Sequence, residues 1–185
     1  MSWKNTTDRY GSLSIGMHWL MLALLIGVYA CIELRGFFPR GSDLREGLKM
    51  WHFMLGLSVF VLVWLRLAIR FVTPAPQMSP QVPGWQRHLA GLMHAVLYVF
   101  LIIMPVLGWL NLSADGKVIP FFGLELPALI GPDKAFAGSV EEVHETIGTL
   151  GYYLIGLHAA AALYHHYFVR DDTLQRMLPA RSSEH

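Results

Sequence analysis

The sequence predicts an all-α integral membrane protein, a single membrane domain over residues 1–185 built as a four-helix bundle. Two observations lead to this prediction. Hydrophobic residues make up 54% of the chain and charged residues only 15%, whereas a soluble domain carries about 25% charged residues. The hydrophobic residues also gather in four stretches, each close to the roughly 20 helical residues that cross a hydrocarbon core. Because lipid offers the backbone no hydrogen bonds, each stretch is expected to be a helix.

The expected spans are residues 13–34, 48–72, 89–112 and 146–169. Proline-containing segments separate them, as is typical of connecting loops. Pro105, inside the third stretch, is expected to kink that helix. The polar start of the chain lacks the short apolar core of a signal peptide, so the first stretch is expected to remain as a membrane anchor.

Charge and cysteine content exclude several classes of function. The formal net charge is +1 and the sequence contains no long basic block, so nucleic acid is not an expected partner. Cys31 is the single cysteine, which excludes an intrachain disulfide and a thiolate-bound zinc or iron–sulfur site. The expected surroundings are a lipid bilayer.

The distribution of cationic residues predicts the orientation in the membrane. With the N-terminus in the cytoplasm, eight of the 14 Lys and Arg residues fall on that side and six on the other. An even number of spans puts both termini on one side, and the positive-inside rule then places them in the cytoplasm.

Histidines are the most informative residues of this sequence. Six of the nine fall in or at the edges of the expected spans: His18, His52, His94, His144, His158 and His165. An imidazole in hydrocarbon is costly unless it has a partner, so each marks a candidate site. The alternative, for any one of them alone, is a hydrogen-bonded packing residue or an interfacial anchor. Their spacing decides between the two interpretations.

His144 and His158 are 14 residues apart on the fourth span. At about 100° per residue they lie on one face of the helix, about 21 Å apart along its axis. Antiparallel threading brings His18 to the depth of His158, and His52 to the depth of His144. The sequence therefore predicts two bis-histidine sites at two depths of the bundle.

Haem is the cofactor that suits such sites. Its iron takes one axial ligand on each face of the macrocycle, and facing helices of a bundle can supply one each. Zinc would need three or four ligands at one depth. No CxxCH motif is present, so the haems are expected to be non-covalent and of b type. The expected fold is thus a four-helix bundle holding two haems.

The other histidines allow more than one interpretation. His94 is a possible alternative haem ligand. His165 lies about 10 Å beyond His158 on a similar face. It is either an interfacial anchor, in which case His166 is the functional residue, or a donor to a quinone carbonyl, with Arg70 and Ser14 nearby. His88 is expected at the interface, and His185 has no evident role.

Four stretches of the sequence together resemble the bacterial cytochrome b561 family. They are SIGMHW at 14–19, ELRGFFPR at 33–40, KMWHFMLGLSVFVLVWLRLAIR at 49–70 and EEVHETIGTLGYYLIGLHAAAALYHHYF at 141–168. The likeness covers nearly the whole chain and is closest to the small stand-alone members, which oxidise superoxide and reduce ubiquinone. It implies iron ligation by His18 with His158 and by His52 with His144, the same pairs that depth alone predicts.

The resemblance also implies a function and a location. An inner-membrane protein of this kind would take electrons from superoxide at the periplasmic face and pass them through two haems b to ubiquinone, with no obligatory protein partner. A cationic entrance would speed the encounter with the superoxide anion. Nine acidic residues share that side with six cations. The six cations are the candidates for the entrance: Arg35, Arg40, Arg45, Lys49, Lys117 and Lys134. No catalytic side chain is assigned.

A different class of function stays open at this point. The chain could be a cytochrome b membrane-anchor subunit that relays electrons between a soluble dehydrogenase or hydrogenase and the quinone pool. Such a subunit needs a docking surface, and the outer segment of roughly residues 113–140 is long enough to form one. A haem-free transporter is disfavoured, because the histidines pair in depth.

Overall fold

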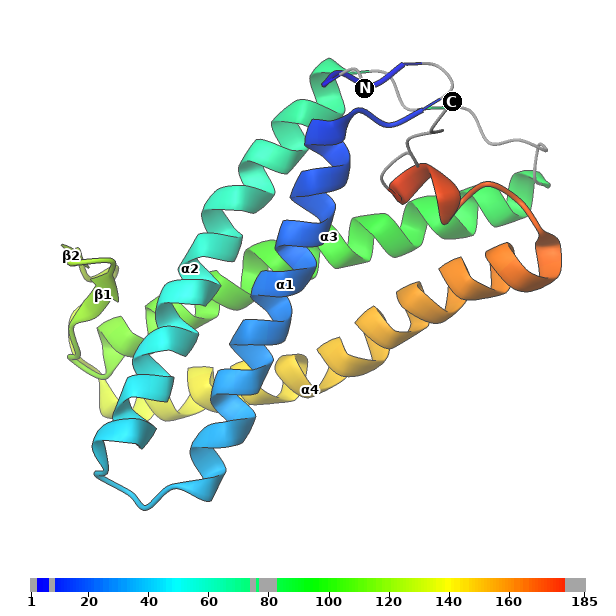
Figure 1. The fold of residues 1–185 in the computed structure, drawn as a ribbon. Helices are drawn as coiled ribbons and strands as arrows, with labels where there is room; N and C mark the ends of the chain where they lie inside the picture. The colour runs from blue at the N-terminus through cyan, green and yellow to red at the C-terminus, as the bar shows by residue number, and fades with distance from the viewer. Residues whose placement is uncertain (1–2, 7–8, 74–75, 77–82, 179–185) are drawn as a thin grey trace. The chain divides into compact units, whose positions relative to one another are not determined.

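The computed structural model describes residues 3–6, 9–73, 76 and 83–178, so His185 lies outside the described part. Four long helices account for most of these residues (Figure 1): α1 (Ser12–Leu34), α2 (Asp43–Val72), α3 (Gly84–Ala114) and α4 (Lys134–Tyr164). A 3-10 turn at Arg35–Phe37 follows α1, and a π-helical turn at His165–Val169 continues α4. A second 3-10 turn, Gln175–Met177, lies near the C-terminal end of the described chain.

All four helices are long and apolar enough to cross a membrane, which confirms the predicted fold class. The mean hydropathy of the best window in each lies between 1.3 and 2.2, and at most 17% of any such window is buried inside the protein. An apolar surface of that extent cannot face water without aggregating. Lipid must therefore cover the outward faces of these helices.

Helices α2, α3 and α4 begin earlier than the hydrophobic pattern predicts. α2 begins at Asp43 rather than at residue 48, α3 at Gly84 rather than at residue 89, and α4 at Lys134 rather than at residue 146. Helices α2 and α4 have an N-terminal cap: Ser42 Oγ accepts the amide of Arg45, and Asp133 Oδ1 accepts the amide of Phe136. Hydropathy marks only the part of a helix that lipid covers, so these polar first turns escape it.

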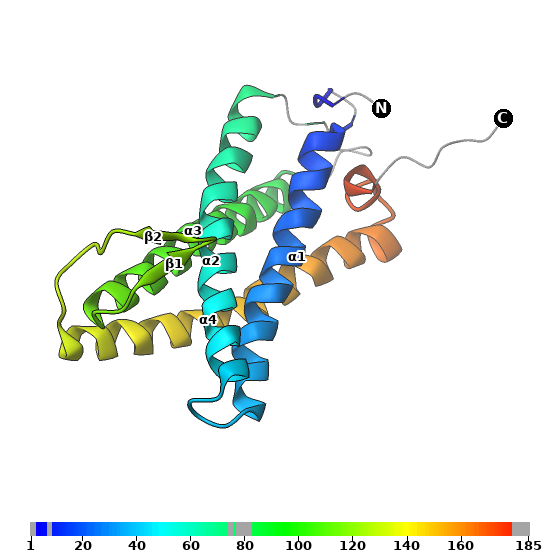
Figure 2. The same ribbon diagram turned by 60° about the vertical axis from the view of Figure 1, so that its left-hand side comes forward.

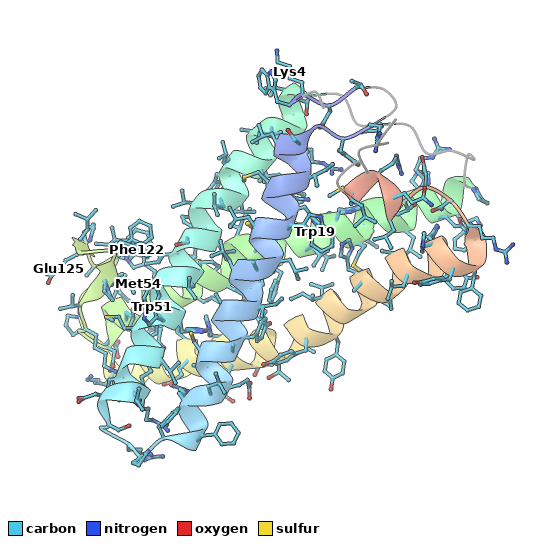
Figure 3. The ribbon with its side chains drawn as sticks, in the orientation of Figure 1. Lys4, Trp19, Trp51, Met54, Phe122 and Glu125 are labelled. Atoms are coloured by element: carbon cyan, nitrogen blue, oxygen red, sulfur yellow. The ribbon has the colours of Figure 1, made fainter. Side chains whose placement is uncertain are left out.

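A β-hairpin occupies the long segment between α3 and α4 (Figure 2). Strands β1 (Ile119–Phe121) and β2 (Leu124–Leu126) pair antiparallel. Both residues between them, Phe122 and Gly123, have positive φ, which matches the twist of a tight two-residue hairpin turn. The side chain of Phe122 packs edge-on against Trp51 of α2, with ring centroids 6.3 Å apart (Figure 3). The hairpin is therefore attached to the helices.

The described chain divides into two compact units, and each helix contributes residues to both. Unit 1 comprises residues 1–20, 64–97 and 152–185, and unit 2 comprises residues 21–63 and 98–151.

The core of unit 2 joins three helices and the hairpin. Met21, Val59 and Val63 form one buried cluster, against which residues of α1, α2 and α3 pack. Leu57 and Leu112 form another with Ile119 of β1. These clusters bury the inward faces of the helices while their outward faces remain apolar for lipid.

A hydrogen bond and a pair of glycines bring α1 and α4 close together in unit 2. Tyr29 Oη donates to the Gly148 carbonyl at 2.8 Å. A Cβ at Gly151 would collide with the Tyr29 hydroxyl and with the ring of Phe100. Small residues at such crossings let helix backbones approach closely.

In unit 1, polar contacts join terminal segments to the helix ends. Asn5 Oδ1 accepts hydrogen bonds from the Gly11 amide and the Ser14 hydroxyl, while Asn5 Nδ2 donates to Thr73 Oγ1. At the other terminus, Trp19 Nε1 of α1 donates to the Met177 carbonyl at 2.7 Å.

Candidate functional site

Unit 2 brings the rings of His52 of α2 and His144 of α4 together in an edge arrangement. Their ring centroids are 6.2 Å apart and the ring planes meet at 71°. Nδ1 of His52 lies 2.9 Å from the Val28 carbonyl, so it donates, and Nε2 of the neutral ring then carries the lone pair. His144 packs on the backbone of Gly108, where a Cβ would lie 3.5 Å from its Cε1. The buried Nδ1 of His144 has no hydrogen-bond partner among the described residues.

Unit 1 holds the other predicted pair, and a third histidine joins it. The rings of His18 and His158 have centroids 6.3 Å apart at 67°. His94 of α3 approaches His158 from another side, with a centroid separation of 5.5 Å. His94 Nδ1 donates to the Ala90 carbonyl, one turn earlier in its own helix, at 2.7 Å.

The ring separations of the two predicted pairs suit a metal ion held between them. A metal–imidazole nitrogen bond of about 2 Å on each side, plus roughly 1 Å from nitrogen to ring centre, gives about 6 Å between opposed rings. His18 with His158 and His52 with His144 meet this requirement, whereas His94 with His158 is somewhat short of it. Each pair supplies two nitrogens, and haem iron takes two axial ligands.

An arginine that the sequence analysis did not connect with the site contacts one of these histidines. Arg66 Nη2 of α2 lies 3.2 Å from Nδ1 of His18. A charged residue inside a span is by default a candidate functional residue, and that signal would have found Arg66. Its partner was not predictable, since the two residues are separated by 48 positions.

The three residues proposed for a quinone site all lie in unit 1, but no described contact joins them. Ser14 lines a cavity of about 390 Å³ together with Trp3, Lys4 and residues at the end of α2. Its hydroxyl already donates to Asn5 at 2.7 Å. Arg70 is exposed, near the end of α2. His165, instead, bonds Asp171.

Among the candidate cations for superoxide, most have partners within the described residues. Arg45 donates to the carbonyls of Arg35 and Phe38, and Lys49 pairs with Glu46. Lys117 and Lys134 both bind Asp115.

Arg35 is the one of the six candidate cations whose charge acts on His52. It is paired only loosely with Glu145, at 3.9 Å. Arg40 is exposed and forms no ion pair among the residues that the structure describes. Any attraction of an anion toward His52 therefore falls mainly on Arg35.

Comparisons with known proteins agree with this geometry. The chain matches the family described as prokaryotic cytochrome b561 over residues 9–180. It is 37% identical to cytochrome b561 homolog 1 of Escherichia coli over 174 residues, which cover 94% of this chain and 99% of that protein. It is also 37% identical to a probable superoxide oxidase CybB of Yersinia pestis over 173 residues, covering 94% and 97% of the two chains. A cytochrome b562 of Cereibacter sphaeroides is 28% identical over 179 residues, 93% and 96% of the two chains.

Four membrane-spanning helices, paired histidines inside them and a match over nearly the whole length lead to one assignment. The chain belongs to the prokaryotic cytochrome b561 family, and it is accordingly a haem b electron-transfer protein of the bacterial inner membrane.

Proposed function

We propose that the chain holds two haems b, one between His52 and His144 and one between His18 and His158, and that it oxidises superoxide and reduces ubiquinone. The ring separations of both pairs support the two sites. The 37% identity to a probable superoxide oxidase supports the reaction. When bound, haem supplies reversible one-electron redox chemistry that side chains lack.

The protein's share of this chemistry begins with the tautomers of its histidines. The bond from His52 Nδ1 to the Val28 carbonyl holds the ring in the tautomer that leaves a lone pair on Nε2, the nitrogen that would bind the haem iron. Partners of this kind around a metal-binding histidine fix the ring orientation and raise its basicity. In unit 2 the backbone of α1 supplies this support, so the ligand does not depend on a mobile side chain.

Arg35 has the role of guiding superoxide. The anion gives up one electron and leaves as dioxygen, so the site must attract a charged substrate and release a neutral product. The positive charge of the Arg35 guanidinium, which acts on His52, attracts the superoxide anion and does not retain neutral dioxygen. The lysines of this region are less suited, because Lys49 is paired with Glu46 and both Lys117 and Lys134 are held by Asp115.

The quinone site belongs to unit 1, with His165 as the donor to a carbonyl oxygen and with Arg70 and Ser14 in its surroundings. Ubiquinone takes up two electrons and two protons to become ubiquinol, so a group that carries protons is required beside it. His165 is the best suited of the three, because the Ser14 hydroxyl is already donated to Asn5. An imidazole can both donate to the carbonyl and carry a proton.

The proposed orientation follows from the positive-inside rule, with both termini in the cytoplasm. Superoxide is then oxidised on the periplasmic side, and quinone is reduced on the cytoplasmic side. No obligatory protein partner is part of the proposal.

Stopped-flow mixing of the purified protein with superoxide, while haem absorbance is followed, tests the function. We expect reduction that superoxide dismutase abolishes, and reoxidation when ubiquinone is added. His52→Ala should abolish the reduction. The matched control is His88→Ala, because His88 is an exposed histidine whose described hydrogen bond goes to its own helix. Haem that superoxide leaves oxidised, but a soluble dehydrogenase reduces, would establish the membrane-anchor alternative instead.

A further inference from the structure

The chain reverses direction immediately after α4, and this turn carries a buried acid. The π-helical turn His165–Val169 ends at Arg170, which has φ 59° and ψ 39° in the left-handed region. The amides of Arg170 and Asp171 both point back to the His165 carbonyl. A π-helical turn is rare and occurs frequently at functional sites. Here it brings Asp171 back against the side chain of His165.

Asp171 and His165 form a close, shielded pair. Asp171 Oδ2 lies 2.5 Å from His165 Nδ1, and the Asp171 side chain is 0% exposed while that of His165 is 22% exposed. Asp171 Oδ1 accepts the Thr173 amide at 2.9 Å. Burial tends to raise the pKa of Asp171, but the hydrogen bonds from His165 and Thr173 outweigh it and lower the pKa. The turn therefore stabilises Asp171 in its ionised form.

The segment after Asp171 is anchored at two further points. Arg176 is buried, and its Nη1 donates to the Pro76 carbonyl at 3.1 Å. Trp19 Nε1 holds the Met177 carbonyl. Such anchoring limits the movement of Asp171, so that its bond to His165 has a fixed direction.

The bond has a chemical consequence for His165. With Nδ1–H donated to a carboxylate, Nε2 is the ring nitrogen left for another molecule, and no hydrogen bond to it is found among the described residues. Histidine supported in this way can give a proton from Nε2 and keep its orientation, as in the acid and base steps of a Ser-His-Asp triad.

We propose that Asp171 is a positioning residue for proton transfer to quinone, holding His165 so that its Nε2–H faces the carbonyl oxygen. The inference rests on the proposed quinone site in unit 1. As ubiquinone takes up its two electrons, the His165 Nε2–H bond breaks and an O–H bond forms on the carbonyl oxygen that faces it, while the other carbonyl oxygen takes its proton from water. His165 is left neutral with Nδ1–H still bonded to Asp171, which remains a carboxylate, and water returns the proton to Nε2.

Asp171→Asn separates this role from a structural one. An asparagine keeps an oxygen for the Thr173 amide, so the turn retains its cap, but it removes the charge that supports His165. The matched control is Asp172→Asn, the same change at the neighbouring position, where the carboxylate pairs with Arg176 rather than with the histidine.

The measurement is stopped-flow reoxidation of reduced holoprotein by ubiquinone, with haem content and reduction by superoxide recorded for each variant. We expect His165→Ala and Asp171→Asn each to slow reoxidation about tenfold or more, while haem content and superoxide-dependent reduction stay unchanged. The double variant should be no slower than His165→Ala alone, because Asp171 acts only through His165. Asp172→Asn should match the wild type.

The outcomes distinguish the two layers of the proposal. Unchanged reoxidation in His165→Ala would remove the quinone site from this histidine. Slow reoxidation in His165→Ala with a normal Asp171→Asn, or additive losses in the double variant, would overturn the role of Asp171 alone. For the case in which Asp171→Asn loses haem, ¹⁵N NMR of histidine-labelled wild-type holoprotein gives an independent reading. The His165 resonance, assigned from its absence in His165→Gln, must show protonated Nδ1, and a protonated Nε2 with bare Nδ1 would refute the pairing.

Discussion

Arg66 and His18 are joined through the one nitrogen of His18 that a metal-binding histidine normally uses as a donor. Nη2 of Arg66 lies 3.2 Å from Nδ1 of His18, and a guanidinium only donates. Neutral His18 therefore carries its proton on Nε2. His94 has the opposite tautomer, with Nδ1 donating to Ala90 and a lone pair on Nε2. The two histidines that approach His158 thus differ in tautomer and in the distance of their rings from the His158 ring.

We use the ring separation from His158 to predict which of His18 and His94 is the second haem ligand. We expect His18→Ala to lower the haem content from two per chain to one and His94→Ala to leave it at two, because the His18 and His158 rings have the separation that opposed ligands need. The His18–Arg66 bond would then be exchanged when haem binds. A pyridine haemochrome assay measures the content. Two haems in His18→Ala with one in His94→Ala would make His94 the partner of His158.

Arg35→Gln should slow haem reduction by superoxide about tenfold at low ionic strength and flatten its dependence on salt. The reason is the charge of Arg35 beside His52. Lys117→Gln is the control, because it removes the same formal charge at a lysine that Asp115 holds, and its rate should stay near that of the wild type. Equal losses in both variants would indicate an effect of overall charge, and no loss in Arg35→Gln would remove this residue from the entrance.

Gly151→Ala should destabilise the protein by about 1–3 kcal/mol. Its new Cβ would meet the Tyr29 hydroxyl and the Phe100 ring, both packed tightly against α4. Gly138→Ala, on the same helix and with nothing within 4 Å of its Cβ, should be neutral or slightly stabilising because alanine favours helix. The midpoint of thermal haem loss compares the two. A Gly151→Ala protein as stable as Gly138→Ala would contradict the packing described.

Asp115, just after α3, pairs with Lys117 and with Lys134 at the start of α4, and we call these two ion pairs the clamp. The clamp should persist in mild acid. Hydrogen bonds from Lys117 and Lys134 lower the pKa of Asp115 to about 2. A depressed carboxyl pKa gives stability that is complete above the ordinary value and is lost as the pH falls through the folded value. We expect hydrogen-exchange protection of residues 115–134 to persist at about pH 4 and to disappear toward about pH 2. In Asp115→Asn the protection should already be reduced at neutral pH, and protection equal to that of the wild type would refute the clamp.

Both termini should face the cytoplasm, because eight Lys and Arg residues lie on that side and six on the other. A reporter enzyme that works only in the periplasm, fused after His185, should be silent, and the same reporter inserted after Phe122 of the hairpin turn should be active. The reverse pattern would exchange the faces proposed for superoxide and quinone.

The fold class could be predicted from the sequence because a hydrophobic segment that spans a membrane can adopt few backbone structures. Helical periodicity put His144 and His158 on one face, and antiparallel threading assigned each a depth. In the structure these two residues lie opposite His52 and His18. Helix geometry carries such information over long separations, since position along a straight element follows from residue number.

Other features could not be predicted for reasons that are equally physical. The early start of α4 at Lys134 depends on a cap at Asp133, which hydropathy does not detect. The pairing of Asp171 with His165 depends on a π-helical turn, and no periodicity signals a single extra residue. The approach of His94 to His158 depends on how α3 is rotated, which burial in lipid leaves undetermined.

Each proposed haem site takes one of its two histidines from α4, the last long helix in the described chain. A nascent chain that has delivered α1, α2 and α3 into the bilayer therefore has His18 and His52 in place and nothing opposite them. During synthesis neither haem can be captured before α4 is inserted, and both sites are completed by the same insertion. Both sites therefore become available together, and a chain truncated before residue 144 should bind neither haem and be colourless.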